Sequence, residues 1–160
     1  MLILNSGGTF NKVYNSLNGE LEVPYNNGAI EEILSSVDSP YELAGVIYKD
    51  SLDMTMEDRK TLANIILHST ERVFIIVHGT DTMHLSAEFL SEIFEDRIIV
   101  FVGSMRPFSI DKVEASLNLG MAIGFATAQS NNGVYICMSG FVKPWQELVK
   151  NHKFGRFELA

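Results

Sequence analysis

The sequence has a single cysteine, Cys137, and few basic residues for its length. One cysteine excludes an internal disulfide and suits a reducing compartment, so we expect a cytoplasmic protein. The 160 residues carry 12 Lys and Arg against 20 Asp and Glu, a net charge of −8 that argues against a nucleic-acid or anionic membrane partner. The longest apolar runs have only the length of strands, so we expect neither a membrane span nor a secretory signal.

Several motifs that mark cofactor and metal sites are also absent. The chain lacks a G-x-G-x-x-G dinucleotide fingerprint, a Gly-Lys-Ser/Thr phosphate loop and the G-x-S-x-G elbow of serine hydrolases. Its four histidines, His68, His78, His84 and His152, form no H-E-x-x-H motif and do not pair with cysteines. We therefore expect no cofactor and no metal ion.

Short apolar runs alternate with amphipathic segments along the chain, which is typical of repeated strand–helix–strand units. The expected strands cover residues 2–5, 41–48, 72–77, 98–102 and 133–138. The expected helices cover residues 29–36, 55–69, 82–94 and 113–128. Right-handed crossovers predict an α/β fold with a doubly wound, mainly parallel sheet flanked by helices in flavodoxin-like order. A chain of 160 residues is expected to form one domain.

A few segments are harder to assign. Residues 10–22 lack a sustained period, and their Asn-Gly turn pair at 18–19 is compatible with a small hairpin. Residues 145–150 are expected to form a short helix, and residues 154–159 a strand without an obvious partner. The helix over 113–128 is apolar nearly all round, so it is either buried within the domain or an oligomer face. We favour the oligomer face and expect a homo-oligomer.

Polar segments rich in glycine, hydroxyl and charged residues follow four of the expected strands. They cover residues 6–9, 49–54, 78–81 and 103–107, whereas the strands before them are apolar. Ligands of open α/β sheets bind beyond the carboxyl ends of the strands. A site built on this scaffold is therefore expected among these four segments.

Two of these segments carry a threonine beside glycine. The paired glycines of Gly-Gly-Thr at residues 7–9 allow a ligand to approach the backbone closely, although a tight turn with an exposed threonine explains them equally well. His-Gly-Thr-Asp-Thr at residues 78–82 opens a helix, and a helix cap needs only one of its polar side chains. The helix N-terminus also favours a carboxylate or a developing oxyanion there.

These two motifs resemble those of the bacterial-type L-asparaginase (asparaginase/glutaminase) family. A strand followed by Gly-Gly-Thr-Phe at residues 7–10, and a later strand followed by His-Gly-Thr-Asp-Thr-Met at 78–83, occur there in the same order and at similar spacing. Asp-Ser-Leu-Asp-Met at 50–54 and Val-Gly-Ser-Met-Arg-Pro at 102–107 support the resemblance, which covers nearly the whole chain. It implies that residues 1–160 form a single domain like the family's N-terminal domain, without its C-terminal domain.

The resemblance implies roles for individual residues. Thr9 matches the family's nucleophilic threonine, and Tyr14 matches the tyrosine that helps to activate it. Thr80 matches the second catalytic threonine, Asp81 the acid that binds the substrate amino group, and Lys150 the lysine that activates the second threonine. All five are therefore candidate catalytic residues.

The resemblance places substrate binding on the same loops. Ser51 matches the hydroxyl that binds the substrate α-carboxylate. Backbone N–H groups near Gly8 and near Gly79 and Thr80 are candidate donors to an oxyanion. The residue after Ser51 is commonly glutamine in the family and is Leu52 here, so recognition of the polar end of the substrate is expected to be weaker or altered.

The implied activity is hydrolysis of L-asparagine to L-aspartate and ammonia through an ester on a threonine. Such chemistry needs a nucleophile, a group that takes its proton and donors for the oxyanion, and a lysine can take a proton only in its neutral form. The alternative is a catalytically weakened or inactive relative that binds asparagine or aspartate, as the missing C-terminal domain and Leu52 suggest. In both cases the expected partner is a small amino acid.

Overall fold

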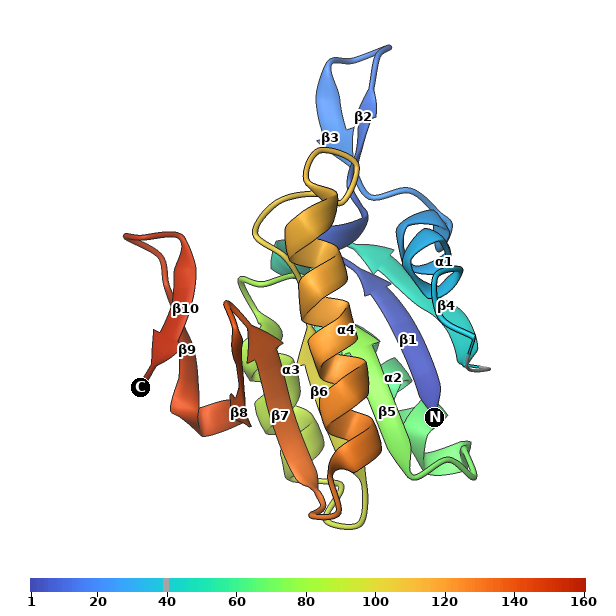
Figure 1. Ribbon diagram of the computed structural model, residues 1–160, viewed down its shortest axis with the longest axis vertical. Coiled ribbons are helices and arrows are strands. Elements are labelled where there is room, and N and C mark those ends of the chain that lie inside the picture. The colour runs from blue at the N-terminus through green and yellow to red at the C-terminus, as the bar shows by residue number, and fades with distance from the viewer. Residues whose placement is uncertain (39–40) are drawn as a thin grey trace.

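The computed structural model describes residues 1–38 and 41–160, in which helices cover both faces of one main sheet (Figure 1). Within those residues the main sheet has six strands, in the order β4-β1-β5-β6-β7-β8. Their bounds are Leu2–Gly7 for β1, Glu42–Lys49 for β4, Val73–Val77 for β5, Ile98–Val102 for β6, Gly133–Met138 for β7 and Phe141–Pro144 for β8. The first five strands in this order are parallel and β8 is antiparallel, which confirms the predicted fold class and flavodoxin-like order.

Two pairs of helices cover the sheet. Helices α2 (Met56–His68) and α3 (Met83–Ser91) share one hydrophobic core with the sheet, and α1 (Gly28–Leu34) and α4 (Lys112–Ala128) share the other. Successive residues of β5 alternate between these two cores and are almost entirely buried. Burial on both faces explains why the central strands read as continuous apolar runs.

The starts of two helices follow from local capping. Thr55 Oγ1 accepts a hydrogen bond from the Asp58 N–H (3.3 Å), and Asp58 Oδ2 accepts one from the Thr55 N–H (2.7 Å), so a capping box begins α2. Asp111 caps α4 by accepting from the Val113 N–H (3.0 Å). Both starts lie within one residue of the sequence-based expectation.

The hairpin expected around the Asn-Gly pair is present as β2 (Val13–Asn15) and β3 (Glu20–Glu22), and it projects beyond the carboxyl edge of the main sheet (Figure 1). Short 3₁₀ helices follow two parallel strands, η1 (Thr9–Asn11) after β1 and η2 (Ser51–Asp53) after β4. Both therefore lie at the same carboxyl edge.

The expected helix over 145–150 is wrong beyond its first turn. Only η3 (Trp145–Glu147) is helical, and strand β9 (Leu148–Asn151) follows it. The strand expected over 154–159 does have a partner, because β10 (Arg156–Leu159) pairs antiparallel with β9. The hairpin buries one large apolar side chain from each strand in the core beneath α2 and α3, which a short helix over 145–150 would not bring together.

One face of helix α4 is buried and the other is exposed, although the sequence of the helix is apolar nearly all round. Its inner residues are buried on the sheet, whereas Val113 and Leu117 are 74% and 57% exposed. The oligomer face therefore stays a prediction. No helix in the described residues has both the length and the apolar character needed to cross a membrane.

Candidate active site

Three loops at the carboxyl edge of the sheet lie in direct backbone contact. Gly8, at φ +80°, donates its N–H to the Lys49 carbonyl (2.8 Å), and a Cβ atom added to Gly8 would overlap the backbone of Gly79. A Cβ added to Gly79 would lie only 2.6 Å from the Cβ of Ser51. Glycine at both positions therefore allows the loops that carry Thr9, Ser51 and Thr80 to meet.

Two buried asparagines hold the turn before Thr9. Asn5 Oδ1 accepts hydrogen bonds from the Gly7 N–H (2.9 Å) and from Asn11 Nδ2 (3.0 Å), and Asn11 Nδ2 also donates to the Gly7 carbonyl (2.9 Å). Asn5 is fully buried and Asn11 is 3% exposed. Sequence reasoning missed both residues, although an asparagine that ends an apolar strand is a usable signal.

Lys150 joins the loop after β5 to the C-terminal hairpin. Its Nζ donates to Thr80 Oγ1 (2.8 Å) and to Asp81 Oδ1 (2.6 Å). The lysine side chain is 10% exposed and the aspartate side chain 31%, while Thr80 is 3% exposed. The structure therefore brings Lys150 to Thr80 and Asp81, on β9 instead of on the expected helix.

Ser51 is tied to the same loop from the other side. Its Oγ accepts from the Asp81 N–H (3.2 Å), and its carbonyl accepts from Thr82 Oγ1 (2.7 Å). Ser51 is 1% exposed, and within the described residues its hydroxyl hydrogen has no acceptor. That hydrogen can be donated to a ligand that reaches the loop.

The loop at residues 103–107 is anchored by acidic side chains. The Glu114 carboxylate accepts from the Met105 N–H (2.8 Å) and the Arg106 N–H (3.1 Å). Arg106 Nη1 donates to Asp111 Oδ2 (2.8 Å), which lowers the pKa of that carboxyl. Arg106 is thus a loop anchor here, and Glu114 is a supporting residue that sequence reasoning missed.

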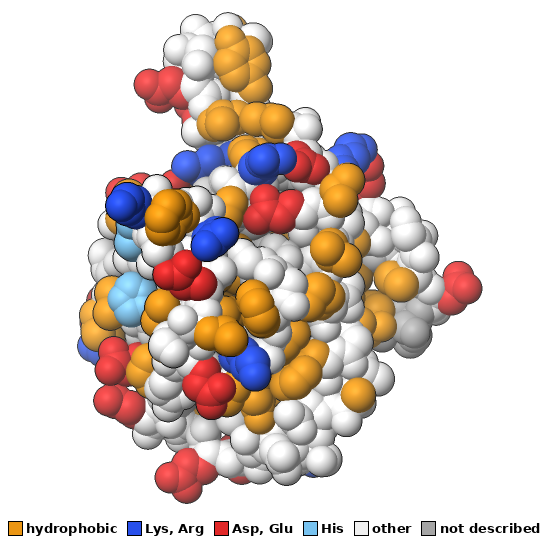
Figure 2. Space-filling model, turned by 60° about the vertical axis from the view of Figure 1, so that its left-hand side comes forward, with side chains coloured by type: hydrophobic (Ala, Val, Ile, Leu, Met, Phe, Trp, Pro, Cys, Tyr) orange, Lys and Arg blue, Asp and Glu red, His pale blue; other side chains and the backbone are white. Residues whose placement is uncertain are grey.

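Tyr14 is the one expected catalytic residue that the structure leaves apart from this cluster. It lies on β2, its residue is 65% exposed, and in the described part of the chain its hydroxyl makes no hydrogen bond. Figure 2 shows hydrophobic side chains on the projecting hairpin, where Leu17 is 94% exposed. The carboxyl edge of the sheet therefore carries Thr9, Ser51, Thr80, Asp81 and Lys150. Tyr14 lies on the hairpin that projects beyond this edge.

A cleft of about 600 Å³ opens between the base of this hairpin and the loop that carries Ser51. Tyr25, Tyr48 and the 73%-exposed Leu52 contribute to its wall. Lys12 and Asp50 form an ion pair (2.5 Å) in the same cleft. The apolar Leu52 side chain therefore lines this cleft and offers no hydrogen bond there, whereas none of the five site residues at the carboxyl edge is among its described lining.

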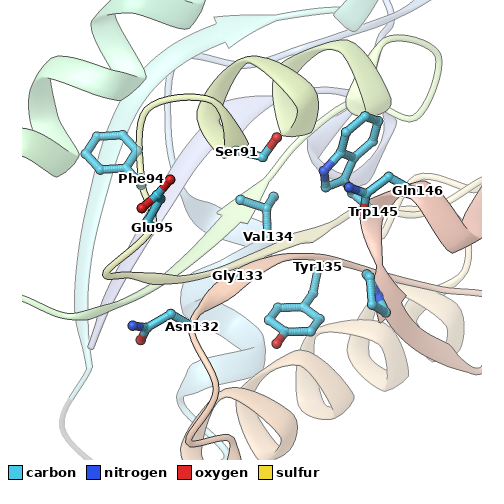
Figure 3. A pocket seen from close by; sticks show the side chains of 10 residues that line it. Ser91, Phe94, Glu95, Asn132, Gly133, Val134, Tyr135, Trp145 and Gln146 are labelled. Atoms are coloured by element: carbon cyan, nitrogen blue, oxygen red, sulfur yellow. The ribbon is translucent and has the colours of Figure 1, made fainter.

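Another cavity, of about 340 Å³, lies at the opposite end of the sheet, where β7 begins and α3 ends (Figure 3). Its lining in the described residues includes Glu95 and Tyr135 as ionisable groups, but no lysine or histidine. It therefore lacks the paired hydroxyl and amine of the carboxyl edge. The described residues also contain no cluster of three or more His, Cys, Asp or Glu side chains that could hold a metal ion.

Comparisons with known proteins point to one family. A family model described as "Asparaginase, N-terminal" matches residues 1–156. The glutaminase-asparaginase of Acinetobacter glutaminasificans is 25% identical over 94% of this chain and 49% of its own length. A glutamyl-tRNA(Gln) amidotransferase protein of Archaeoglobus fulgidus is 33% identical over 86% of this chain and 34% of its own length. This chain therefore spans half or less of the length of each of these relatives.

The fold has a close counterpart among solved structures. The thermostable L-asparaginase from Thermococcus kodakarensis superposes with a TM-score of 0.84 over 99% of this chain and 50% of its own chain, at 22% identity. At that identity the likeness establishes the fold alone.

Proposed function

The chain belongs to the asparaginase family, whose N-terminal domain it matches over residues 1–156, and from this premise we propose that it carries the nucleophile of an amidohydrolase. The reaction is hydrolysis of L-asparagine to L-aspartate and ammonia, and Thr9 is the nucleophile. The observation that carries the proposal is the bridge from Lys150 Nζ to Thr80 Oγ1 and Asp81 Oδ1.

Substrate binding in this proposal uses the two loops beside Thr9. The Asp81 carboxylate pairs with the substrate ammonium group, and the Ser51 hydroxyl donates to its α-carboxylate. Lys150 Nζ lies 2.8 Å from Thr80 Oγ1, and only a neutral amine at this position could accept the proton of that hydroxyl.

The proposed covalent step uses the same loops. Thr9 Oγ attacks the side-chain amide carbon, and backbone N–H groups of the loops that carry Thr9 and Thr80 donate to the oxyanion. The C–N bond breaks, the proton that Thr9 loses passes to the amide nitrogen, and ammonia leaves. Water then attacks the ester on Thr9, which releases aspartate and restores the hydroxyl.

In this proposal the preferred amide depends on Leu52, the residue after Ser51. Relatives named for glutaminase, asparaginase and amidotransferase activities match this chain, so both asparagine and glutamine are to be tested as substrates. Leu52 makes an apolar wall where a hydrogen-bonding side chain is common in the family, and an apolar wall recognises a polar substrate less strongly. We therefore propose weaker substrate affinity than a glutamine at this position would give.

Lys150→Met tests the bridge that carries the proposal. The variant keeps the length of the side chain but removes the proton acceptor, so ammonia release from asparagine is expected to fall about 10²-fold to 10⁴-fold. Lys153→Met is the matched control, because Lys153 lies on the same hairpin and its ammonium group stands over the Phe154 ring. Ammonia is measured with the purified full chain, and calorimetry with aspartate measures binding.

Two results would count against the proposal. If the wild-type chain releases no ammonia from either amide, it is not a hydrolase of these substrates. Saturable aspartate binding in that case would favour the alternative, an inactive relative that retains an amino-acid pocket. If Lys150→Met is as active as Lys153→Met, the lysine bridge has no catalytic role.

A further inference from the structure

Three polar side chains form a buried chain of hydrogen bonds behind the loop that carries Thr80. Arg59 Nε lies 3.1 Å from Ser86 Oγ, Ser86 Oγ lies 2.9 Å from His78 Nε2, and His78 Nδ1 lies 2.7 Å from the Gly79 carbonyl oxygen. His78 and Ser86 are fully buried and Arg59 is 7% exposed. The three come from different elements, because Arg59 lies on α2, Ser86 on α3 and His78 directly after β5.

The ends of this series determine the direction of its two outer hydrogen bonds. Arg59 can only donate, so Ser86 Oγ accepts at that contact. The Gly79 carbonyl can only accept, so His78 Nδ1 carries a hydrogen and donates it. In a neutral ring Nε2 then has no hydrogen, so Ser86 gives its own hydroxyl hydrogen to Nε2, and the ring is the Nδ1–H tautomer.

Burial and charge both keep the ring neutral. The pKa of His78 is lowered to about 4, chiefly by burial; the hydrogen bond to the Gly79 carbonyl opposes this effect, and the charge of the Arg59 guanidinium adds to it. The ring also packs edge-to-face with Phe101, with ring centroids 5.5 Å apart. The imidazole thus has a fixed position, a fixed charge and a fixed tautomer.

Arg59 is buried but makes no ion pair within the described residues. No carboxylate in those residues lies within 4 Å of its guanidinium, although Glu88 and Glu92 line the same cleft as Arg59. One of its hydrogen bonds is a long one to the Met54 carbonyl (3.4 Å). The shorter one, to Ser86 (3.1 Å), places the arginine at the end of this hydrogen-bonded series.

We propose that Arg59 and Ser86 are positioning residues that act through His78 to fix the plane of the Gly79–Thr80 peptide. The Gly79 carbonyl and the Thr80 N–H belong to one planar unit, so a hydrogen bond that holds the carbonyl also sets the direction of the N–H. Thr80 Oγ1 and Asp81 Oδ1 in turn receive Lys150. The expected effect of this series on catalysis rests on the proposed function, whereas its expected effect on the orientation of the Gly79–Thr80 peptide does not.

The test combines nitrogen NMR of the imidazole with kinetics of the full chain. Wild-type His78 is expected in the single Nδ1–H tautomer. In Ser86→Ala the donor to Nε2 is lost, so the tautomer signature and the amide shifts of Thr80 and Asp81 are expected to change. Misplacement of the Thr80 loop is expected to lower kcat per folded molecule about 10-fold to 100-fold.

Matched variants separate positioning from general stability. Ser86→Thr keeps the hydroxyl and is expected to restore the tautomer signature and most of kcat. Ser91→Ala also removes a hydroxyl from α3, but that hydroxyl donates only to the Glu88 carbonyl (2.7 Å), so no change is expected at His78 or Thr80. If Ser86→Ala fails to fold, Arg59→Lys, which keeps the charge, is compared in its place.

The outcomes distinguish this inference from the proposed function. An Nε2–H tautomer in the wild type, or Ser86→Ala with unchanged Thr80 amide shifts, would overturn the inference whether or not the chain turns over substrate. Absence of ammonia release would instead overturn the proposed function, and the NMR comparison would still decide the role of the hydrogen-bonded series.

Discussion

Thr9→Ala is expected to lower the kcat for asparagine hydrolysis by at least about 10⁴-fold, because the ester pathway has no other nucleophile at that position. Aspartate affinity is expected to change little, since the Asp81 carboxylate and the Ser51 hydroxyl stay in place. Ammonia release and calorimetry on the same preparation measure the two effects separately. A variant that loses turnover of asparagine but still binds aspartate has kept its fold and lost only the catalytic step.

The control for this variant is Thr127→Ala. Thr127 lies near the end of α4, and its hydroxyl donates to the Ile123 carbonyl (2.8 Å), so the same atoms are removed far from the carboxyl edge. Its turnover is expected to match that of the wild type. If Thr9→Ala were as active as Thr127→Ala, Thr9 would be removed from the mechanism, and Thr80 or water would be the attacking group.

Gly8→Ala is expected to lower the free energy of unfolding by about 2–5 kcal/mol. Two costs add at this position: a positive φ of +80° for a residue with a Cβ atom, and overlap of that atom with the Gly79 backbone. The overlap cannot relax without separating the Thr9 loop from the Thr80 loop. Urea denaturation of the full chain measures the loss.

Gly19→Ala separates these two costs. Gly19 has a similar φ of +77°, but the nearest atom to an added Cβ is the Tyr14 hydroxyl oxygen at 3.9 Å. Only the conformational cost applies there, so a loss of about 1–2 kcal/mol is expected. Equal losses at the two glycines would show that the close contact between the loops is not what requires glycine at Gly8.

Elements with strong local signals were predicted well. The β5 and β6 strands read as uninterrupted apolar runs because both of their faces are buried, and the start of α2 carries its own capping box. The hairpin was signalled by Asn18 and Gly19. In each case the residues that determine the structure are neighbours in the sequence.

The rest depends on partners far apart in the sequence. Strand β9 is defined by its pairing with β10 and by burial of Leu148 and Phe157, which no local period reveals. Lys150 reaches Thr80 across 70 residues, and its assignment came from the family resemblance alone.

Tyr14 and the oligomer face of α4 stay predictions. Tyr14 lies on β2 and is 65% exposed, and within the described residues its hydroxyl makes no hydrogen bond. Val113 and Leu117 are exposed on α4, but exposure alone does not identify what covers them.

The most direct measurement of the central claim is trapping of the covalent intermediate. The full chain is mixed with asparagine, quenched in acid during turnover, digested and analysed by mass spectrometry. An aspartyl ester is predicted on the peptide that contains Thr9. The ester is expected to be absent from Thr9→Ala and to accumulate when ester hydrolysis is slowed. Thr9 would be contradicted as the nucleophile if ammonia were released while the ester was found on Thr80, or while no peptide carried an ester under these conditions.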